Sequence, residues 1–115
     1  MQGWWGPSGE RDPEMAGAMI RGSHCFAVAE AEGRIIGMGR ALSDGVSDAY
    51  IQDVVVDPAF RGRGIGSRIV EDLVHRLRHD GIDWIGLGAE AGTYDFYRKA
   101  GFTELPGCLV MLKKP

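Results

Sequence analysis

The chain has 115 residues, of which 44% are hydrophobic and 25% are charged, and it carries a formal net charge of −3 at pH 7. This length and composition are typical of one globular domain over residues 1–115. The negative charge argues against a general nucleic-acid-binding protein. No apolar run is long enough to cross a bilayer, and the N-terminus lacks a signal peptide's order of basic and then apolar residues. We therefore expect a cytoplasmic protein without a membrane partner.

The N-terminal residues predict a loop followed by a helix. In residues 1–12, Gly and polar side chains surround Trp4 and Trp5, which favours a loop. We expect the two Trp side chains to pack as a cap on the sheet, in a substrate pocket or in a dimer contact. Asp12 is a suitable N-cap for a helix over residues 13–21, which has Pro at its first position.

Three strands are expected next along the chain. Residues 25–30 alternate in polarity, and together with residues 34–42 they predict a hairpin around a tight Glu-Gly turn that begins at Glu32. The next connection begins at Asp44, and residues 49–56 then predict a third strand.

A long amphipathic helix is expected after the third strand. Apolar residues recur at helical spacing from a start near Gly64 over about 15 residues. This apolar stripe consists of Ile65, Ile69, Val70, Leu73, Val74 and Leu77. Gly81 stands where the helix should end.

The C-terminal part of the chain predicts a strand, a short helix and a hairpin. The apolar run at residues 82–87 suits a strand, and the short helix begins at Tyr94. Residues 102–105 and 108–112, on either side of a Pro-Gly turn, predict the two strands of a last hairpin. Strands followed by alternating strands and helices indicate an α/β sandwich around a mixed sheet.

The loop between the third strand and the long helix is an expected phosphate-binding site. The free N–H groups and the positive dipole end of a helix N-terminus attract anions, and Arg61 and Arg63 add two positive charges. A nucleotide P-loop is excluded because no Lys follows the glycines. A dinucleotide-binding fingerprint is excluded because Ser67 or Ile69 stands where its third Gly is required.

Two motifs of this chain resemble those of a known family. The loop Arg61-x-x-Gly64-x-Gly66 resembles the Gln/Arg-x-x-Gly-x-Gly/Ala loop of the GNAT superfamily of acyl-CoA N-acyltransferases, which wraps the pyrophosphate of coenzyme A. Residues 93–102, Thr-Tyr-Asp-Phe-Tyr-Arg-Lys-Ala-Gly-Phe, resemble the second signature of that superfamily. The resemblance implies an α/β (α+β) fold with a mixed, mostly antiparallel sheet flanked by helices.

The chain is short for this family. GNAT domains usually open with a strand and a long helix, and no alternating apolar run precedes the helix expected at residues 13–21. The chain therefore looks like a short form that lacks the usual first strand and much of the first helix. A bare sheet edge invites pairing with another chain, so a homodimer is a plausible assembly.

The resemblance implies an N-acetyltransferase that passes an acetyl group from acetyl-CoA to a primary amine of a small molecule or to an exposed amino group, by direct attack in a ternary complex and without a metal. The implied CoA-binding residues are Val54, Val55, Val56, Arg61, Gly62, Arg63, Gly64, Ile65, Gly66 and Ser67. An amide of Val54 or Val55 is also implied to hold the oxyanion. Tyr97 stands at the family's position for the acid that protonates the thiolate, and Tyr94 is the alternative.

The sequence offers several general bases and singles out none. Gln52 occupies the strand position where many relatives have Glu, and an amide cannot accept a proton from an ammonium group. Asp53 should point to the opposite face, because strand side chains alternate. Tyr50 and Glu90 are further candidates. A water relay, or an amine that arrives neutral, needs no dedicated base.

Two other pairs of residues are expected to be structural. His75 and His79 have a spacing that can bind a metal, but they lie on or beside the charged face of the helix, so we expect solvated side chains and no metal. Cys25 and Cys108 each fall in a predicted strand, so we expect two small buried thiols.

A second function from a different class stays open. It is a catalytically silent GNAT-fold module that binds CoA or a protein partner, and the shortened N-terminus and Gln52 support it. The phosphate loop and Tyr97 support the enzyme instead. A further hypothesis is an acidic pocket for a cationic amine, formed by Asp44, Asp48, Asp53 and Glu90.

Overall fold

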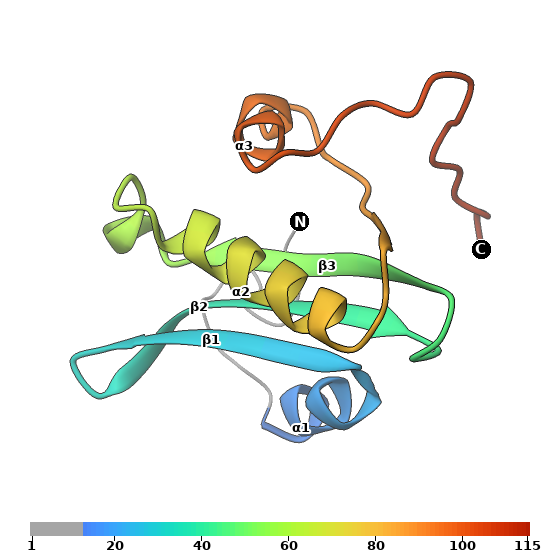
Figure 1. Cartoon of the computed structure of the whole chain (residues 1–115). Coiled ribbons are helices and arrows are strands. Elements are labelled where there is room, and N and C mark those ends of the chain that lie inside the picture. Colours follow the sequence, from blue (N-terminus) through green and yellow to red (C-terminus); the bar gives the residue numbers. More distant parts are fainter. Residues whose placement is uncertain (1–12) are drawn as a thin grey trace.

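The computed structural model describes residues 13–115, and the expected N-terminal loop, its Trp pair and the Asp12 cap lie outside the described residues. Along the described chain a helix is followed by three strands, and then by a second helix, a short strand and a third helix (Figure 1). The elements are α1 (Pro13–Gly22), β1 (Cys25–Ala31), β2 (Arg34–Ser43), β3 (Asp48–Val56), the 3-10 turn η1 (Pro58–Phe60), α2 (Ile65–His79), β4 (Trp84–Gly86) and α3 (Tyr94–Lys99). The predicted elements from α1 to α2 are confirmed, and so is α3. Their observed bounds differ from the predicted ones by a residue or two.

The described strands form a four-stranded sheet in the order β1-β2-β3-β4. The first three strands are antiparallel neighbours, and β4 pairs with β3 in parallel. Glu32 and Gly33 both have positive φ, 55° and 74°, as the tight turn of a hairpin requires. The predicted mixed, mostly antiparallel sheet flanked by helices is confirmed.

Helix α2 covers one face of the sheet, because its apolar stripe is buried there. Ile69, Val70, Leu73 and Leu77 are at most 3% exposed, and they share a cluster with the sheet residues Ala41, Ala49 and Ile51. Full burial of such a side chain contributes about 1.5–3 kcal/mol. This packing fixes the N-terminus of α2 close to the end of β3.

The predicted C-terminal hairpin does not form. No residue from 102 to 115 is in a strand, and the recorded backbone bond within this segment is a turn in which Cys108 N donates to Leu105 O. An isolated hairpin is marginally stable in water and needs a sheet or helix to pack against. Here the neighbouring strand β4 shrinks to Trp84–Gly86, shorter than the predicted residues 82–87. Cys108 is consequently exposed rather than buried, whereas Cys25 is half-buried.

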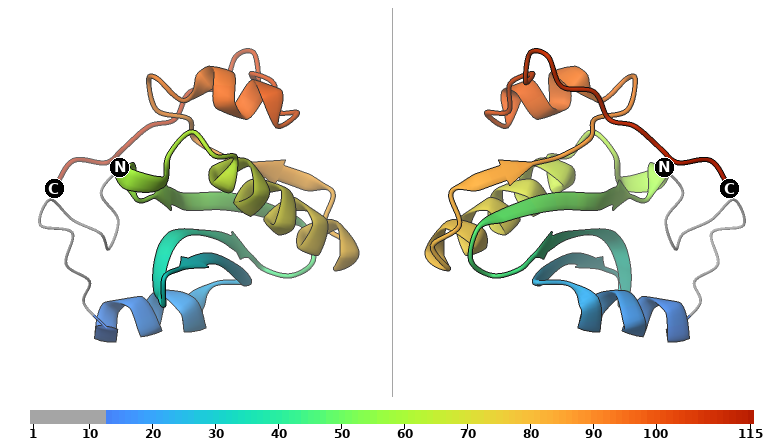
Figure 2. Two further views of the ribbon diagram at one scale, coloured as in Figure 1. Left: turned by 90° about the vertical axis from the view of Figure 1, so that its left-hand side faces the viewer. Right: turned by 90° about the vertical axis from the view of Figure 1, so that its right-hand side faces the viewer.

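The two shorter helices lie at opposite ends of the sheet. Figure 2 shows α1 beyond β1 and α3 beyond β3 and β4. No helix of the described residues is both long and apolar enough to span a membrane. The face of the molecule with α3, β3 and the N-terminus of α2 brings together the two sequence motifs.

Candidate functional site

A β-bulge interrupts β3 at Asp53. Met38 pairs with Val55 and Arg40 pairs with Gln52, so two residues of β3 lie opposite one residue of β2. Asp53 has a left-handed φ of 57°, which Asp tolerates better than most residues. The Arg40 Nε donates a 2.8 Å hydrogen bond to Asp53 Oδ2, with side chains only 16% and 12% exposed. The bulge was not foreseen from the sequence, where an Asp inside an apolar run is its one weak signal.

Beyond the bulge, one edge of β3 has no partner strand among the described residues. β4 pairs with β3 only from Asp48 to Tyr50. The other edge of β3 faces β2, and there Asp57 N donates a hydrogen bond to Ile36 O of β2. Because N–H groups alternate between the two edges of a strand, the Val54 and Val56 amides face the open edge. The Val55 amide faces β2, so of the two amides predicted for the oxyanion the geometry favours Val54.

The loop after β3 exposes a row of backbone donors. Asp57 begins the loop by accepting from Ala59 N at 2.9 Å, and Gly62 and Gly64 adopt φ of 78° and 79°. Gly64 is the N-cap of α2, and its left-handed conformation favours Gly. The amides of residues 62–67 have no acceptor among the described residues. This is the geometry of an anion site at a helix N-terminus.

The two arginines of the loop keep their charge available. Arg61 Nε donates to Val56 O at 3.1 Å, which folds this side chain against the end of β3. The Arg63 guanidinium lies 5.2 Å from the Phe60 ring centroid in a cation–π contact. Neither arginine forms an ion pair with a described carboxylate. The loop therefore fits a polyanionic group such as a pyrophosphate.

Helix α3 packs directly on the first turn of α2. A Cβ added at Gly66 would lie 3.2 Å from Phe96 Cζ and 3.6 Å from a methyl of Val56. The absence of a side chain at Gly66 therefore makes room for α3. This contact holds α3 against the first turn of α2, and Tyr97 is the next residue on α3 after Phe96.

Tyr97 is held between two aromatic rings. Its ring lies 4.9 Å from Phe96 and 6.0 Å from Phe102, both in edge-to-face geometry. Its hydroxyl forms no hydrogen bond with a described residue. Partial burial, and secondly the negative charge of Glu90, raise the pKa of Tyr97 above its usual value of 10.0. Tyr97 thus keeps its proton over the physiological pH range. Tyr94, the alternative acid one helical turn earlier, is 48% exposed.

Three of the candidate general bases, Tyr50, Gln52 and Asp53, lie on β3. The side chain of Asp53 is engaged by Arg40, as described above, and Gln52 is exposed. Tyr50 lies edge-on against Trp84, with 5.3 Å between the ring centroids. None of these three positions offers an unpaired carboxylate, so the structure does not single out a base among them.

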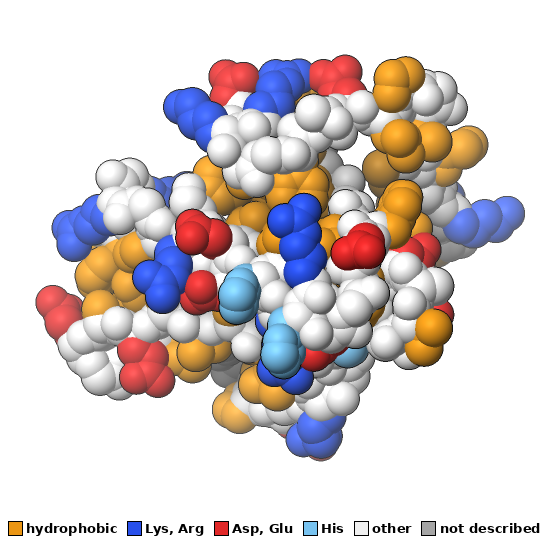
Figure 3. All heavy atoms as spheres, viewed as in Figure 1, with side chains coloured by type: hydrophobic (Ala, Val, Ile, Leu, Met, Phe, Trp, Pro, Cys, Tyr) orange, Lys and Arg blue, Asp and Glu red, His pale blue; other side chains and the backbone are white. Residues whose placement is uncertain are grey.

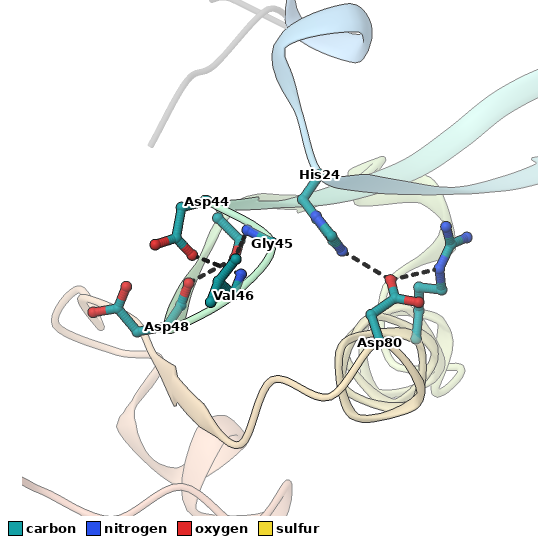
Figure 4. A network of polar contacts seen from close by, with 8 residues as sticks. His24, Asp44, Gly45, Val46, Asp48 and Asp80 are labelled. Atoms are coloured by element: carbon teal, nitrogen blue, oxygen red, sulfur yellow. Dashed lines mark hydrogen bonds and ion pairs between the residues drawn. The ribbon is translucent and has the colours of Figure 1, made fainter.

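Two carboxylates of the predicted acidic pocket, those of Asp44 and Asp48, lie together, because the Ser47 hydroxyl is within hydrogen-bond distance of both. Asp44 accepts hydrogen bonds from the Val46 and Ser47 amides and from the Ser47 hydroxyl (Figure 4). The Ser47 hydroxyl and these amides lower the pKa of Asp44 to about 2. Asp53 lies five residues beyond Asp48 along β3, a distance of about 16 Å, and its carboxylate is paired with Arg40. Asp44 therefore stabilises its own loop.

A polar contact that the sequence did not suggest joins β1 to the end of α2. His24 Nε2 and Asp80 Oδ2 are 2.8 Å apart, and Arg76 Nε donates to the same oxygen at 2.9 Å (Figure 4). His75 and His79 are both exposed on α2, as predicted. Figure 3 shows His side chains among Arg, Asp and Glu on the outer face of α2. No group of residues suited to a metal ion occurs among residues 13–115.

The comparisons with known proteins agree on one family. The sequence profile of the "Acetyltransferase (GNAT) family" matches residues 2–102. The chain is 43% identical over 77 residues to "GCN5-related N-acetyltransferase 2, chloroplastic" of Arabidopsis thaliana, which covers 67% of this chain and 30% of that protein. The chain thus spans less than a third of the length of this relative.

Solved structures share the fold. A protein of unknown function from meticillin-resistant Staphylococcus aureus superposes with a TM-score of 0.80 at 24% identity, over 94% of this chain and 84% of that one. Glucosamine-6-phosphate N-acetyltransferase from Arabidopsis thaliana superposes with a TM-score of 0.74 at 27% identity, over 88% of this chain and 75% of that one.

Proposed function

The chain belongs to the acetyltransferase (GNAT) family, and from that premise we propose that it transfers an acetyl group from acetyl-CoA to a primary amine. One observation carries the proposal: a row of free amides in a basic loop, at residues 62–67, adjoins the open edge of β3. The names of the Arabidopsis relative and of the Arabidopsis solved structure, both N-acetyltransferases, support it.

The loop and the strand edge suit the two parts of coenzyme A that precede the thioester. The amides of residues 62–67, with Arg61 and Arg63, bind the pyrophosphate oxygens. The pantetheine arm is a chain of amides, and it pairs with the open edge of β3 as an additional strand would. The Val54 amide, which faces that edge beside the bulge, donates to the thioester carbonyl oxygen and stabilises the oxyanion.

The reaction then needs one proton removed and one supplied. The amine nitrogen attacks the carbonyl carbon with its lone pair, and the tetrahedral intermediate collapses with cleavage of the C–S bond. Tyr97 gives its proton to the departing thiolate, and the ammonium proton leaves to water. The raised pKa of Tyr97 ensures that the proton is present before transfer. The acceptor is a small-molecule amine or an exposed amino group.

The experiment that tests this function is release of free CoA thiol from acetyl-CoA over a panel of amines. We expect thiol release that depends on one class of amine and continues over many turnovers, with the acetylated amine detected by mass spectrometry. Cys108 is an exposed thiol, so a Cys108→Ser background removes its stoichiometric signal. Release at the same rate without any amine would contradict acetyl transfer.

The arrangement around Gln52 favours a second candidate. The amide side chain at this position and the engaged carboxylate of Asp53 leave this part of β3 without a free base. A module that binds CoA, or a protein partner, without catalysis would have this arrangement. Binding of acetyl-CoA with no amine-dependent turnover on any class of amine would support the module instead of the enzyme.

A further inference from the structure

The bulge in β3 changes which side chains of this strand face α2. Before the bulge, Ala49 and Ile51 lie in the cluster that contains the buried residues of α2, and after it Val54 and Val56 pack against that cluster. A regular strand would continue the alternation through Asp53 instead. Asp53 is therefore the extra residue of the bulge, and its carboxylate stays out of the apolar cluster.

Arg40 binds Asp53 on the face of the sheet that α2 does not cover. The neighbours of Arg40 in β2 face α2, because a Cβ at Gly39 would lie 2.7 Å from Ile69 and Ala41 belongs to the buried cluster. Since strand side chains alternate, Arg40 points to the opposite face. There its Nε lies 2.8 Å from Asp53 Oδ2, and both side chains are largely buried. The ion pair thus joins β2 to the extra residue of β3.

This ion pair fixes the place of the bulge along β3. Asp53 has a left-handed φ of 57°, a conformation that costs energy for any residue with a Cβ and needs support from its surroundings. A largely buried carboxylate that loses its partner is also costly, so Asp53 is stable at this position only beside Arg40. Because Arg40 is anchored in β2, the extra residue of β3 remains at position 53.

The place of the bulge decides which amides of β3 face its open edge. Asp57 N donates to Ile36 O of β2, so the Val55 amide also faces β2 and the Val54 amide faces the open edge. A bulge displaced by one residue along β3 would turn the Val54 amide out of this direction, because successive amides of a strand point to opposite edges.

We propose that Arg40 is a positioning residue, which through Asp53 directs the Val54 amide at the thioester carbonyl. This inference rests on the proposed acetyl transfer, in which the Val54 amide stabilises the oxyanion. Arg40 acts through the bulge and not by contact with the reacting atoms. An oxyanion donor must lie about 2.7–3.1 Å from the developing charge. A rotated amide therefore weakens binding of the transition state more than binding of the cofactor.

The kinetic test compares Arg40→Met with Arg40→Lys in the full chain, at a temperature well below the Tm of both variants. Methionine keeps an unbranched side chain but removes the charge and the donor. The kcat on the amine found by the panel should fall by roughly 10-fold or more, while the Kd of CoA stays close to the native value. Lysine restores a positive charge and an N–H donor, so it should recover a large part of kcat.

The matched control is Arg76→Gln. It removes another arginine–aspartate pair, of 2.9 Å, at the C-terminal end of α2. This variant loses a contact that stabilises the fold but should keep the native kcat.

Amide hydrogen exchange followed by NMR tests the strand directly and does not require turnover. In the native chain without ligand, the Val54 amide should exchange fast and the Val55 amide slowly. In Arg40→Met the protection of the Val55 amide should fall, while the amide of Leu73 in the core of α2 stays protected and shows that the variant is folded.

The proposal would be overturned by an Arg40→Met variant with native kcat and native protection of Val55, or by an Arg40→Lys variant no more active than Arg40→Met. Parallel losses of kcat, CoA binding and Leu73 protection would overturn it too, because the role of Arg40 would then be only structural. A native chain that acetylates no amine would contradict the proposed function. Exchange at Val54 and Val55 would then decide by itself whether Arg40 sets the direction of the amide.

Discussion

The ring of Phe96 lies against the backbone of Gly66, and this contact joins the two sequence motifs into one site. A side chain at Gly66 would begin 3.2 Å from the Phe96 ring, which is closer than carbon atoms normally approach. The phosphate-binding loop and the helix that carries Tyr97 are thus positioned by one shared packing contact. The distance between the loop and α3, which carries Tyr97, depends on the absence of a side chain at Gly66.

A double-mutant cycle tests this contact. Gly66→Val should lower the free energy of unfolding, because the valine displaces Phe96, and the loss should be smaller when Phe96→Ala has already removed the ring. We expect a coupling of about 1 kcal/mol, typical of residues in contact, measured by urea denaturation. Equal effects of Gly66→Val in both backgrounds would show that the two residues do not constrain each other.

The bulge at Asp53 predicts an unusual order of substitutions. Both Asp53→Ala and Asp53→Gly remove the ion pair with Arg40, and both must adopt the left-handed φ of 57°, which strains alanine but not glycine. The free energy of unfolding of the Asp53→Ala variant should therefore be lower than that of Asp53→Gly by about 1 kcal/mol, although glycine usually weakens a strand. Urea denaturation of the two variants measures this difference. If the alanine variant were the more stable of the two, the bulge would not hold its conformation in solution.

The features that could be predicted from the sequence are those set by local patterns. The apolar stripe of α2 and the Glu32 turn depend on residues close together in the chain, so both were predicted. The bulge depends on how β3 aligns with β2, which no local pattern encodes. The prediction of a hairpin over residues 102–105 and 108–112 was wrong, because apolar residues show that a segment can form a strand but not that it pairs with one. In the site, the motif predicted the loop and the start of α2 near Gly64. The packing role of Gly66 could not be predicted, because it depends on where α3 lies in the fold.

Tyr97 is predicted to be the acid of the reaction. Tyr97→Phe removes the proton donor but keeps the edge-to-face contacts with Phe96 and Phe102, so turnover should fall by roughly 10²-fold or more while acetyl-CoA binding is retained. Tyr94→Phe is the matched control, because Tyr94 is exposed one helical turn earlier. Steady-state kinetics on the amine found by the panel measures both. An unchanged kcat in Tyr97→Phe would exclude this residue from the mechanism.

The charge of Glu90 should affect the ionisation of Tyr97. A nearby negative charge disfavours the tyrosinate, and Glu90 contributes in this way to the raised pKa of Tyr97. Glu90→Gln removes that charge, so the pKa of Tyr97 should fall towards its usual value while burial continues to raise it. NMR titration of the tyrosine rings resolves Tyr97 from the other tyrosines. A pKa that rises in Glu90→Gln would reverse the assigned sign.

The contact between β1 and the end of α2 predicts a pH-dependent stability. Hydrogen bonds from His24 and then from Arg76 lower the pKa of Asp80, so the contact stabilises the fold above the unfolded-state pKa of about 3.9 and is lost as the pH falls through the lower folded-state value. Asp80→Asn should therefore lower Tm near neutral pH, and the difference from the native chain should shrink in acid. A Tm difference that grew as the pH fell would contradict this assignment.

The binding of acetyl-CoA by the basic loop is tested most directly by thermal unfolding with and without acetyl-CoA. The native chain should be stabilised by about 2.7 kcal/mol when acetyl-CoA is present at about 100 times its Kd. The double variant Arg61→Gln, Arg63→Gln should lose most of this shift at the same acetyl-CoA concentration. The variant Arg68→Gln, which alters an exposed arginine of α2 paired with Asp72, should keep it. A native chain that acetyl-CoA does not stabilise would contradict the account of the phosphate-binding loop.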